Sequence, residues 1–214
     1  MSAIAKVRCA LMLLLGAVAG CALTSKSDPM TPRHFSPDEA RGRTQLAAAS
    51  SIAEAEAGPQ GIELRLGRVT AASYLGERIV FRDSNYELGY YEERRWTERP
   101  EAYLRRAVAR ALFEDRGLRR VVSGAGPALD IELSELAELR SPPVARVRVT
   151  YVLYDDRLVR HQATLTIERP IPGAATPKES ADTAARAMAD ALGDAVHQIA
   201  DRVAADLRRG AAIR

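Results

Sequence analysis

The chain has 214 residues, of which 47% are hydrophobic, and its 31 basic and 28 acidic side chains give a net charge of +3. A charge so close to balance argues against nucleic-acid binding, which needs clustered positive charge, so no nucleic-acid partner is expected. The length is that of one domain with a tether, and the apolar content is sufficient for a packed core.

The first twenty residues have the order of a secretory signal. Lys6 and Arg8 form a basic start, and the apolar run 9–19 is about half of the ~20 residues needed to span a bilayer. A cysteine then stands directly after a small-residue cleavage site, Val18-Ala19-Gly20-Cys21. This arrangement resembles the lipobox of bacterial lipoproteins. The alternative interpretation is an ordinary secretory signal with an incidental cysteine.

The lipobox resemblance implies that residues 1–20 are a lipoprotein signal peptide and that Cys21 is the lipidation site. Cys21 would carry a diacylglycerol and a further acyl chain such as palmitate, and two or more acyl chains suffice for stable anchoring. Removal of the signal leaves 29 basic and 28 acidic side chains and one cysteine, so no disulfide can form within a mature chain. Ala22 stands where aspartate would retain a lipoprotein at the inner membrane, so we expect anchoring at the periplasmic face of the outer membrane.

Residues 21–60 contain few large apolar side chains and are rich in serine, proline, alanine and charge. This composition predicts a lipidated, flexible tether with a helical portion around 44–57. As a coil the tether would span roughly 35 Å, and about 130 Å fully stretched. We therefore expect the folded domain, residues 61–209, to stand clear of the lipid headgroups.

The first half of the expected domain alternates apolar and polar residues and then changes to a helical period. Strands are predicted at 62–66, 78–82 and 86–91. The turn-forming residues Asp83-Ser84-Asn85 join the last two as a hairpin. Apolar residues then recur every three or four positions over 103–112, which predicts an amphipathic helix that begins near Pro100 and ends before Gly117.

The second half is a run of strands followed by one long helix. Strands are predicted at 118–123, 128–139, 144–154 and 158–168. The last two form a hairpin, and in the final strand we expect every second residue from Val159 to Ile167 to face the core. A capping box at Thr176 opens an amphipathic helix that continues to Leu207. Helices packed on a mixed β-sheet make this a single domain of the α/β class.

Three motifs stand in order along the first half of the domain: Ile62–Val69, Tyr74-Leu75-Gly76-Glu77-Arg78-Ile79-Val80-Phe81-Arg82, and Arg95-Trp96-Thr97-Glu98-Arg99-Pro100 with the helix after it. The series resembles the ABC-type transport auxiliary lipoprotein family, and with the long C-terminal helix the resemblance covers most of residues 61–207. It implies an α/β sandwich and a periplasmic lipoprotein that works with an MCE (mammalian-cell-entry) lipid transport system. The best-known system of this kind is the paraquat-inducible one.

The resemblance implies a subunit that acts by binding and docking, with an MCE-domain protein and an ABC permease and ATPase as its partners. The loop 123–127 lacks the Lys-Ser/Thr pair and the helix of a P-loop, and the serines have no recognisable triad partners. We therefore expect no enzymatic activity and no cofactor. The alternative is an outer-membrane assembly lipoprotein that places lipopolysaccharide or another envelope component. The sequence leaves open whether copies of the chain form a homo-oligomer.

The candidate partner-binding residues are Arg94, Arg95 and Trp96, because arginine, tryptophan and tyrosine dominate binding hot spots. The alternative is that Trp96 packs beneath the start of the following helix. No metal site is expected, because the three histidines lie in unrelated predicted elements: His34, His161 and His197.

Overall fold

The computed structural model describes residues 31–37, 61–156, 158–173 and 176–212. The described residues from Pro32 onward belong to one structural unit. The predicted signal peptide, the lipidation of Cys21 and the helical portion around 44–57 lie outside the described residues.

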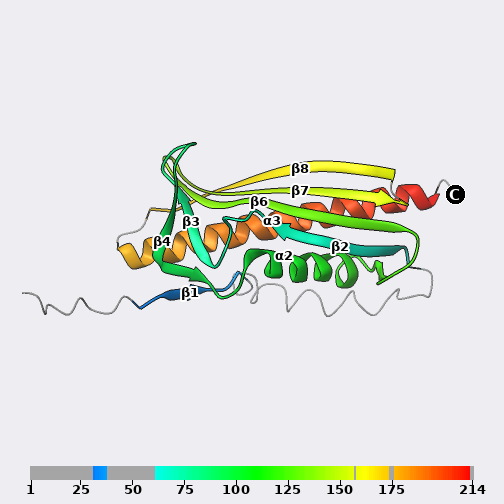
Figure 1. Cartoon of the computed structure of the whole chain (residues 1–214), viewed down its shortest axis with the longest axis horizontal. Coiled ribbons are helices and arrows are strands. Elements are labelled where there is room, and N and C mark those ends of the chain that lie inside the picture. The colour runs from blue at the N-terminus through cyan, green and yellow to red at the C-terminus, as the bar shows by residue number, and fades with distance from the viewer. Residues whose placement is uncertain (1–30, 38–60, 157, 174–175, 213–214) are drawn as a thin grey trace, which may run out of the picture. The chain divides into compact units, whose positions relative to one another are not determined.

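The described residues form eight strands and two α-helices, the first of which continues into a π-helix. In chain order the elements are β1 (Arg33–Phe35), β2 (Glu63–Ala71), β3 (Arg78–Arg82), β4 (Leu88–Trp96), α2 (Pro100–Ala109), η3 (Arg110–Glu114), β5 (Arg119–Arg120), β6 (Pro127–Arg140), β7 (Pro143–Asp155), β8 (Leu158–Pro170) and α3 (Pro177–Ala212). This is the predicted mixed sheet with helices packed on it (Figure 1). The α/β fold class is therefore confirmed.

The sheet divides at its central strand, β6. One edge of β6 pairs antiparallel with β7, which in turn pairs with β8. The other edge is shared, since β2 runs parallel to the first half of β6 and β3 runs parallel to its second half. Beyond β3 follow β4 and then β1, while β5 lies beyond β2. Figure 1 shows β3 and β4 turning away from the long strands at one end of the sheet. This branch carries residues 94–96.

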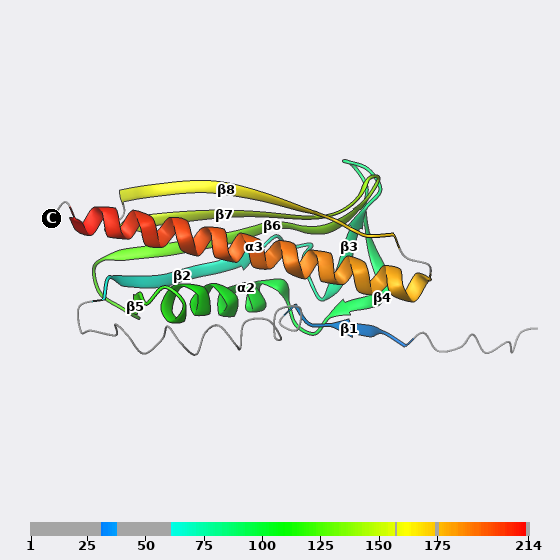
Figure 2. The same cartoon turned by 180° about the vertical axis from the view of Figure 1, so that it is seen from behind.

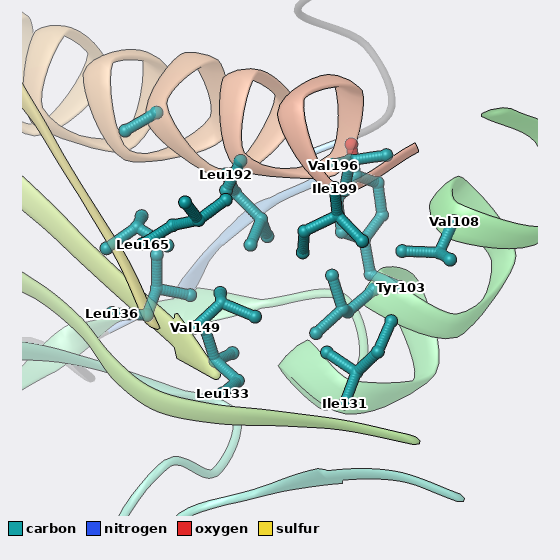
Figure 3. Close-up of a cluster of buried hydrophobic side chains, with 14 of the residues drawn as sticks. Tyr103, Val108, Ile131, Leu133, Leu136, Val149, Leu165, Leu192, Val196 and Ile199 are labelled. Carbon is teal, nitrogen blue, oxygen red and sulfur yellow. The ribbon is translucent and has the colours of Figure 1, made fainter. Parts of the chain in front are cut away.

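The core lies between one face of the sheet and α3, which follows the long strands from end to end (Figure 2). The predicted apolar stripe of α3 is buried along its whole length: Ala181, Ala185, Met188, Leu192, Val196, Ile199, Val203 and Leu207. Opposite it lie alternate residues of β7, as expected for a strand that turns one face to a helix: Val147, Val149, Tyr151 and Leu153. Figure 3 shows how the side chains of α3 meet those of β6, β7 and β8.

Sequence signals mark the starts of both α-helices and the end of the first. Pro100 is the first residue of α2, and after η3 the chain turns at Gly117, whose φ is +66°. The hydroxyl of Thr176 accepts a hydrogen bond from the backbone N–H of Glu179 at 3.2 Å, as the predicted capping box requires. From there α3 continues for 36 residues, which at 1.5 Å per residue is about 54 Å.

A bulge in β8 turns Val159 to the face opposite the one predicted for it. Leu153 pairs with His161, but the next residue of β7, Tyr154, pairs with Val159. Arg160 is therefore an extra residue without a partner position, and the alternation of side chains shifts across it. Val159 is 61% exposed as a result, so the prediction that it faces the core is wrong.

A second correction concerns the tether expected over residues 21–60. Arg33–Phe35 form β1, which pairs in parallel with the end of β4, so a flexible tether is wrong for these residues. Arg33 also forms an ion pair with Asp182 of α3, and Phe35 lies beside Trp96 in the ladder. Smaller differences occur at β4, which extends to Trp96, and at β5, which has two residues rather than six.

Candidate functional site

The three residues predicted to bind a partner do not share one surface. β4 is extended through Arg94, Arg95 and Trp96, so consecutive side chains point to opposite sides of the sheet. Trp96 faces the core and is 3% exposed. The structure therefore gives Trp96 the packing role that was the alternative interpretation, and only Arg95 points away from the core.

Arg94 belongs to a polar cluster on the core side of the sheet, around the carboxylate of Glu138 on β6. Nη1 of Arg94 lies 3.7 Å from Oε2 of Glu138, and the Tyr91 hydroxyl donates a hydrogen bond to the same oxygen at 2.9 Å. The Arg94 guanidinium lies 3.9 Å from the centroid of the Tyr91 ring, and burial raises the pKa of Tyr91. Because a buried carboxylate must be paired and hydrogen-bonded, this cluster has a structural role.

Arg95 lies in a row of basic side chains on the opposite side of the sheet. Its ladder partner on β1 is His34, and its ladder partner on β3 is Arg78. Partners on neighbouring strands point to the same side, with Cβ atoms about 4.5–5.5 Å apart, and like charges so placed destabilise a sheet. Arg78 and Arg95 thus concentrate positive charge at this end of the strand.

This row borders an open depression with a volume of about 510 Å³, which we call the basic depression. The residues that give the basic depression its chemistry come from β3, β4 and the connections beside them: Glu77, Arg78, Tyr90, Arg95 and Arg99. The Tyr90 hydroxyl donates a hydrogen bond to the backbone carbonyl of Tyr74 at 3.2 Å. The guanidinium of Arg78 lies 5.8 Å from the centroid of the Tyr90 ring, so the aromatic ring holds this arginine at the rim.

The guanidiniums of Arg78 and Arg95 form no ion pair within the described part of the chain. Nε of Arg95 is moreover buried without a hydrogen-bond partner among these residues. Some other arginines of the sheet are paired with carboxylates: Nε of Arg82 lies 3.2 Å from Glu135, and Nε of Arg146 lies 2.7 Å from Glu168. The basic depression can therefore accept an anion.

Potential metal ligands and potential membrane-spanning helices are the other features of interest among the described residues. The three histidines lie apart on β1, β8 and α3, and no group of three or more potential metal ligands occurs among the described residues. Within the same ranges, no helix has both the length and the hydropathy needed to cross a membrane.

Sequence reasoning missed Arg78, Arg99 and His34 as neighbours of Arg95. They come from three separate segments, and only the pairing of β1, β3 and β4 brings them together. The strand period separates Arg95 from Arg94 and Trp96, but the predicted strand ends at residue 91, so this signal applies only once β4 is known to extend to Trp96.

Comparisons with known proteins place the chain in a family. The family described as ABC-type transport auxiliary lipoprotein component matches residues 45–204, a range that begins within the predicted tether. The solved structure of protein XCC0632 from Xanthomonas campestris, assigned to the DUF330 family, is 21% identical, with a TM-score of 0.60 over 72% of this chain and 92% of that chain. An uncharacterized protein is 13% identical, with a TM-score of 0.54 over 66% of this chain and 92% of that one. These likenesses show the fold, and no curated protein matches the sequence.

Proposed function

We propose that this chain, which belongs to the family of ABC-type transport auxiliary lipoprotein components, is a membrane-anchored subunit of an MCE-type lipid transporter of the cell envelope. The family match over residues 45–204 is the observation that carries the proposal. The subunit would act by binding and docking rather than by catalysis, with a separate permease and ATPase supplying the energy for transport.

The anchor in this proposal is a lipid on Cys21, inserted in the periplasmic leaflet of the outer membrane. Its support is the small-residue site before Cys21 and the presence of Ala22 after it. Mass spectrometry of the mature N-terminus is expected to show an acylated cysteine, and Cys21→Ser is expected to leave the protein unprocessed or released from membranes. An unmodified Cys21 in the mature chain contradicts the anchor, and fractionation with the inner membrane contradicts the location.

The partners in this proposal are an MCE-domain protein and the permease and ATPase of the same system. The surface that we assign to partner contact is the one around Arg95, because Arg94 and Trp96 are engaged on the core side of β4. An arginine without an ion pair at the end of a rigid ladder is the kind of residue that anchors interfaces.

Crosslinking in intact cells followed by purification tests these partners. Wild-type protein is expected to retain the MCE-domain protein, and Arg95→Ala is expected to weaken its recovery. Arg110→Ala is the matched control. It removes the same charge from a side chain that is 73% exposed on η3, away from β4. Normal recovery with Arg95→Ala places the interface elsewhere. If wild-type protein captures no MCE or ABC component, the transporter role itself is wrong.

A further inference from the structure

We propose that the basic depression binds a phosphate group. This inference deepens the proposed function, since it names the ligand chemistry of the surface around Arg95. It rests on the charges and geometry of that surface, and its test uses no transporter component, so either idea can fail without the other.

The first argument is the excess of positive charge at a fixed place. Three arginines line the basic depression, and one carboxylate, that of Glu77, lines it with them. Arg99 has a distant carboxylate neighbour in Glu101 at 3.8 Å, whereas Arg78 and Arg95 form no ion pair within the described residues. Opposed arginines in a ladder repel each other. An anion between them removes that repulsion.

The second argument is that the arginines are held in place before any ligand arrives. The backbone of Arg95 is fixed by pairing on both sides of β4, with β1 and with β3, which sets where its side chain begins. Arg78 lies over the ring of Tyr90, which is itself tied to the carbonyl of Tyr74. Groups positioned in this way lose little conformational freedom on binding, which favours affinity.

The third argument is the match between donors and ligand. A guanidinium presents its N–H groups in a planar fork that pairs with two oxygens of a phosphate, and Arg78, Arg95 and Arg99 all line the basic depression. The volume of about 510 Å³ lies within the roughly 300–1,000 Å³ of small-molecule sites.

Calorimetric titration of the purified full chain with inorganic phosphate tests the proposal. Saturable binding is expected, and Arg95→Gln and Arg78→Gln are each expected to weaken it about tenfold or more, as for loss of a charged hydrogen-bond donor. Arg110→Gln removes the same charge from an exposed position and is expected to change nothing. Circular dichroism checks that each variant is folded. Arg78 is exposed, so Arg78→Gln keeps the test valid if Arg95→Gln is not folded.

Several results would overturn the proposal. They are the absence of saturable binding at millimolar phosphate, equal weakening by Arg110→Gln, and acetate binding as tightly as phosphate. The last result would show that the depression binds anions in general and does not select phosphate.

Glycerophosphoglycerol, the deacylated headgroup of phosphatidylglycerol, distinguishes two sources of the phosphate. If it displaces inorganic phosphate, the depression accepts the phosphodiester of a lipid headgroup. If it does not, the depression accepts a free phosphate group only. Both results support a phosphate site, and they differ in whether the ligand belongs to the membrane.

Discussion

Leu192→Ala tests the packing of α3 on the sheet, on which the whole fold depends. Leu192 is 1% exposed and lies near the middle of α3, facing Leu136, Val149 and Leu165 of the sheet (Figure 3). The change removes three buried carbon atoms, a transfer loss of about 2 kcal/mol at ~0.8 kcal/mol per methylene. The strand side chains are themselves buried and cannot collapse into the space. A cavity contribution therefore raises the expected loss to about 3–4 kcal/mol, within the ~2–5 kcal/mol range for such changes.

Urea denaturation of the purified protein measures this loss. Circular dichroism follows the helices, and the fluorescence of Trp96, which is 3% exposed in the fold, reports the opening of the core. Leu158→Ala is the matched control, because Leu158 is 76% exposed at the start of β8, and a surface change of this kind costs within about 0.5 kcal/mol. A loss below about 0.5 kcal/mol for Leu192→Ala, or equal losses for both variants, would refute the packing of α3 described above.

Two further changes test polar contacts. Tyr91→Phe removes the hydrogen bond from Tyr91 to the buried carboxylate of Glu138 and is expected to cost about 1–2 kcal/mol in urea denaturation; an unchanged midpoint would show that water replaces the hydroxyl. Glu98→Gln removes the carboxylate whose pKa the hydrogen bond from Arg106 holds below the ordinary 4.5. Because both side chains are partly exposed, the loss at pH 7 is expected to be about 0.5 kcal/mol. A group with a lowered pKa stabilises the fold above its ordinary pKa and loses this effect as the pH falls through the lowered value, so the difference between wild type and Glu98→Gln is expected to vanish in acid. A difference that persists there would contradict the ion pair.

The elements that sequence predicted well are those in which one pattern extends over many residues. The stripe of α3 repeats over its full length, and the alternation of β7 continues through Val147, Val149, Tyr151 and Leu153. β1 has three residues and draws its stability from pairing with β4, so no periodic pattern could indicate it. The bulge at Arg160 was equally inaccessible, because one extra residue changes the faces of a strand without changing its composition.

The candidate site was also predicted only in part, because its residues come from short segments that are distant in sequence. Arg95 was predicted, but it was grouped with Arg94 and Trp96 by proximity in sequence. The predicted strand ends at residue 91, and only the observed extension of β4 to Trp96 puts these two on the other face. The residues that complete the basic depression, Arg78 and Arg99, come from β3 and from the residue before α2. Their convergence depends on β3 pairing with both β4 and β6, which is a property of the topology rather than of any local pattern.

At the end of β4, the arginine on the core side is paired with a carboxylate, whereas the arginine on the outward side is not paired within the part of the chain that the structure describes. On the core side, the positive charge of Arg94 meets Glu138 and the ring of Tyr91. On the other side, Arg95 faces Arg78 in the ladder, and neither forms an ion pair among the described residues. Repulsion of this kind reduces stability, and local conflicts in a fold that is consistent elsewhere tend to occur at functional sites. The opposed arginines on the outward side of β4 are the local conflict from which the proposed phosphate site is argued.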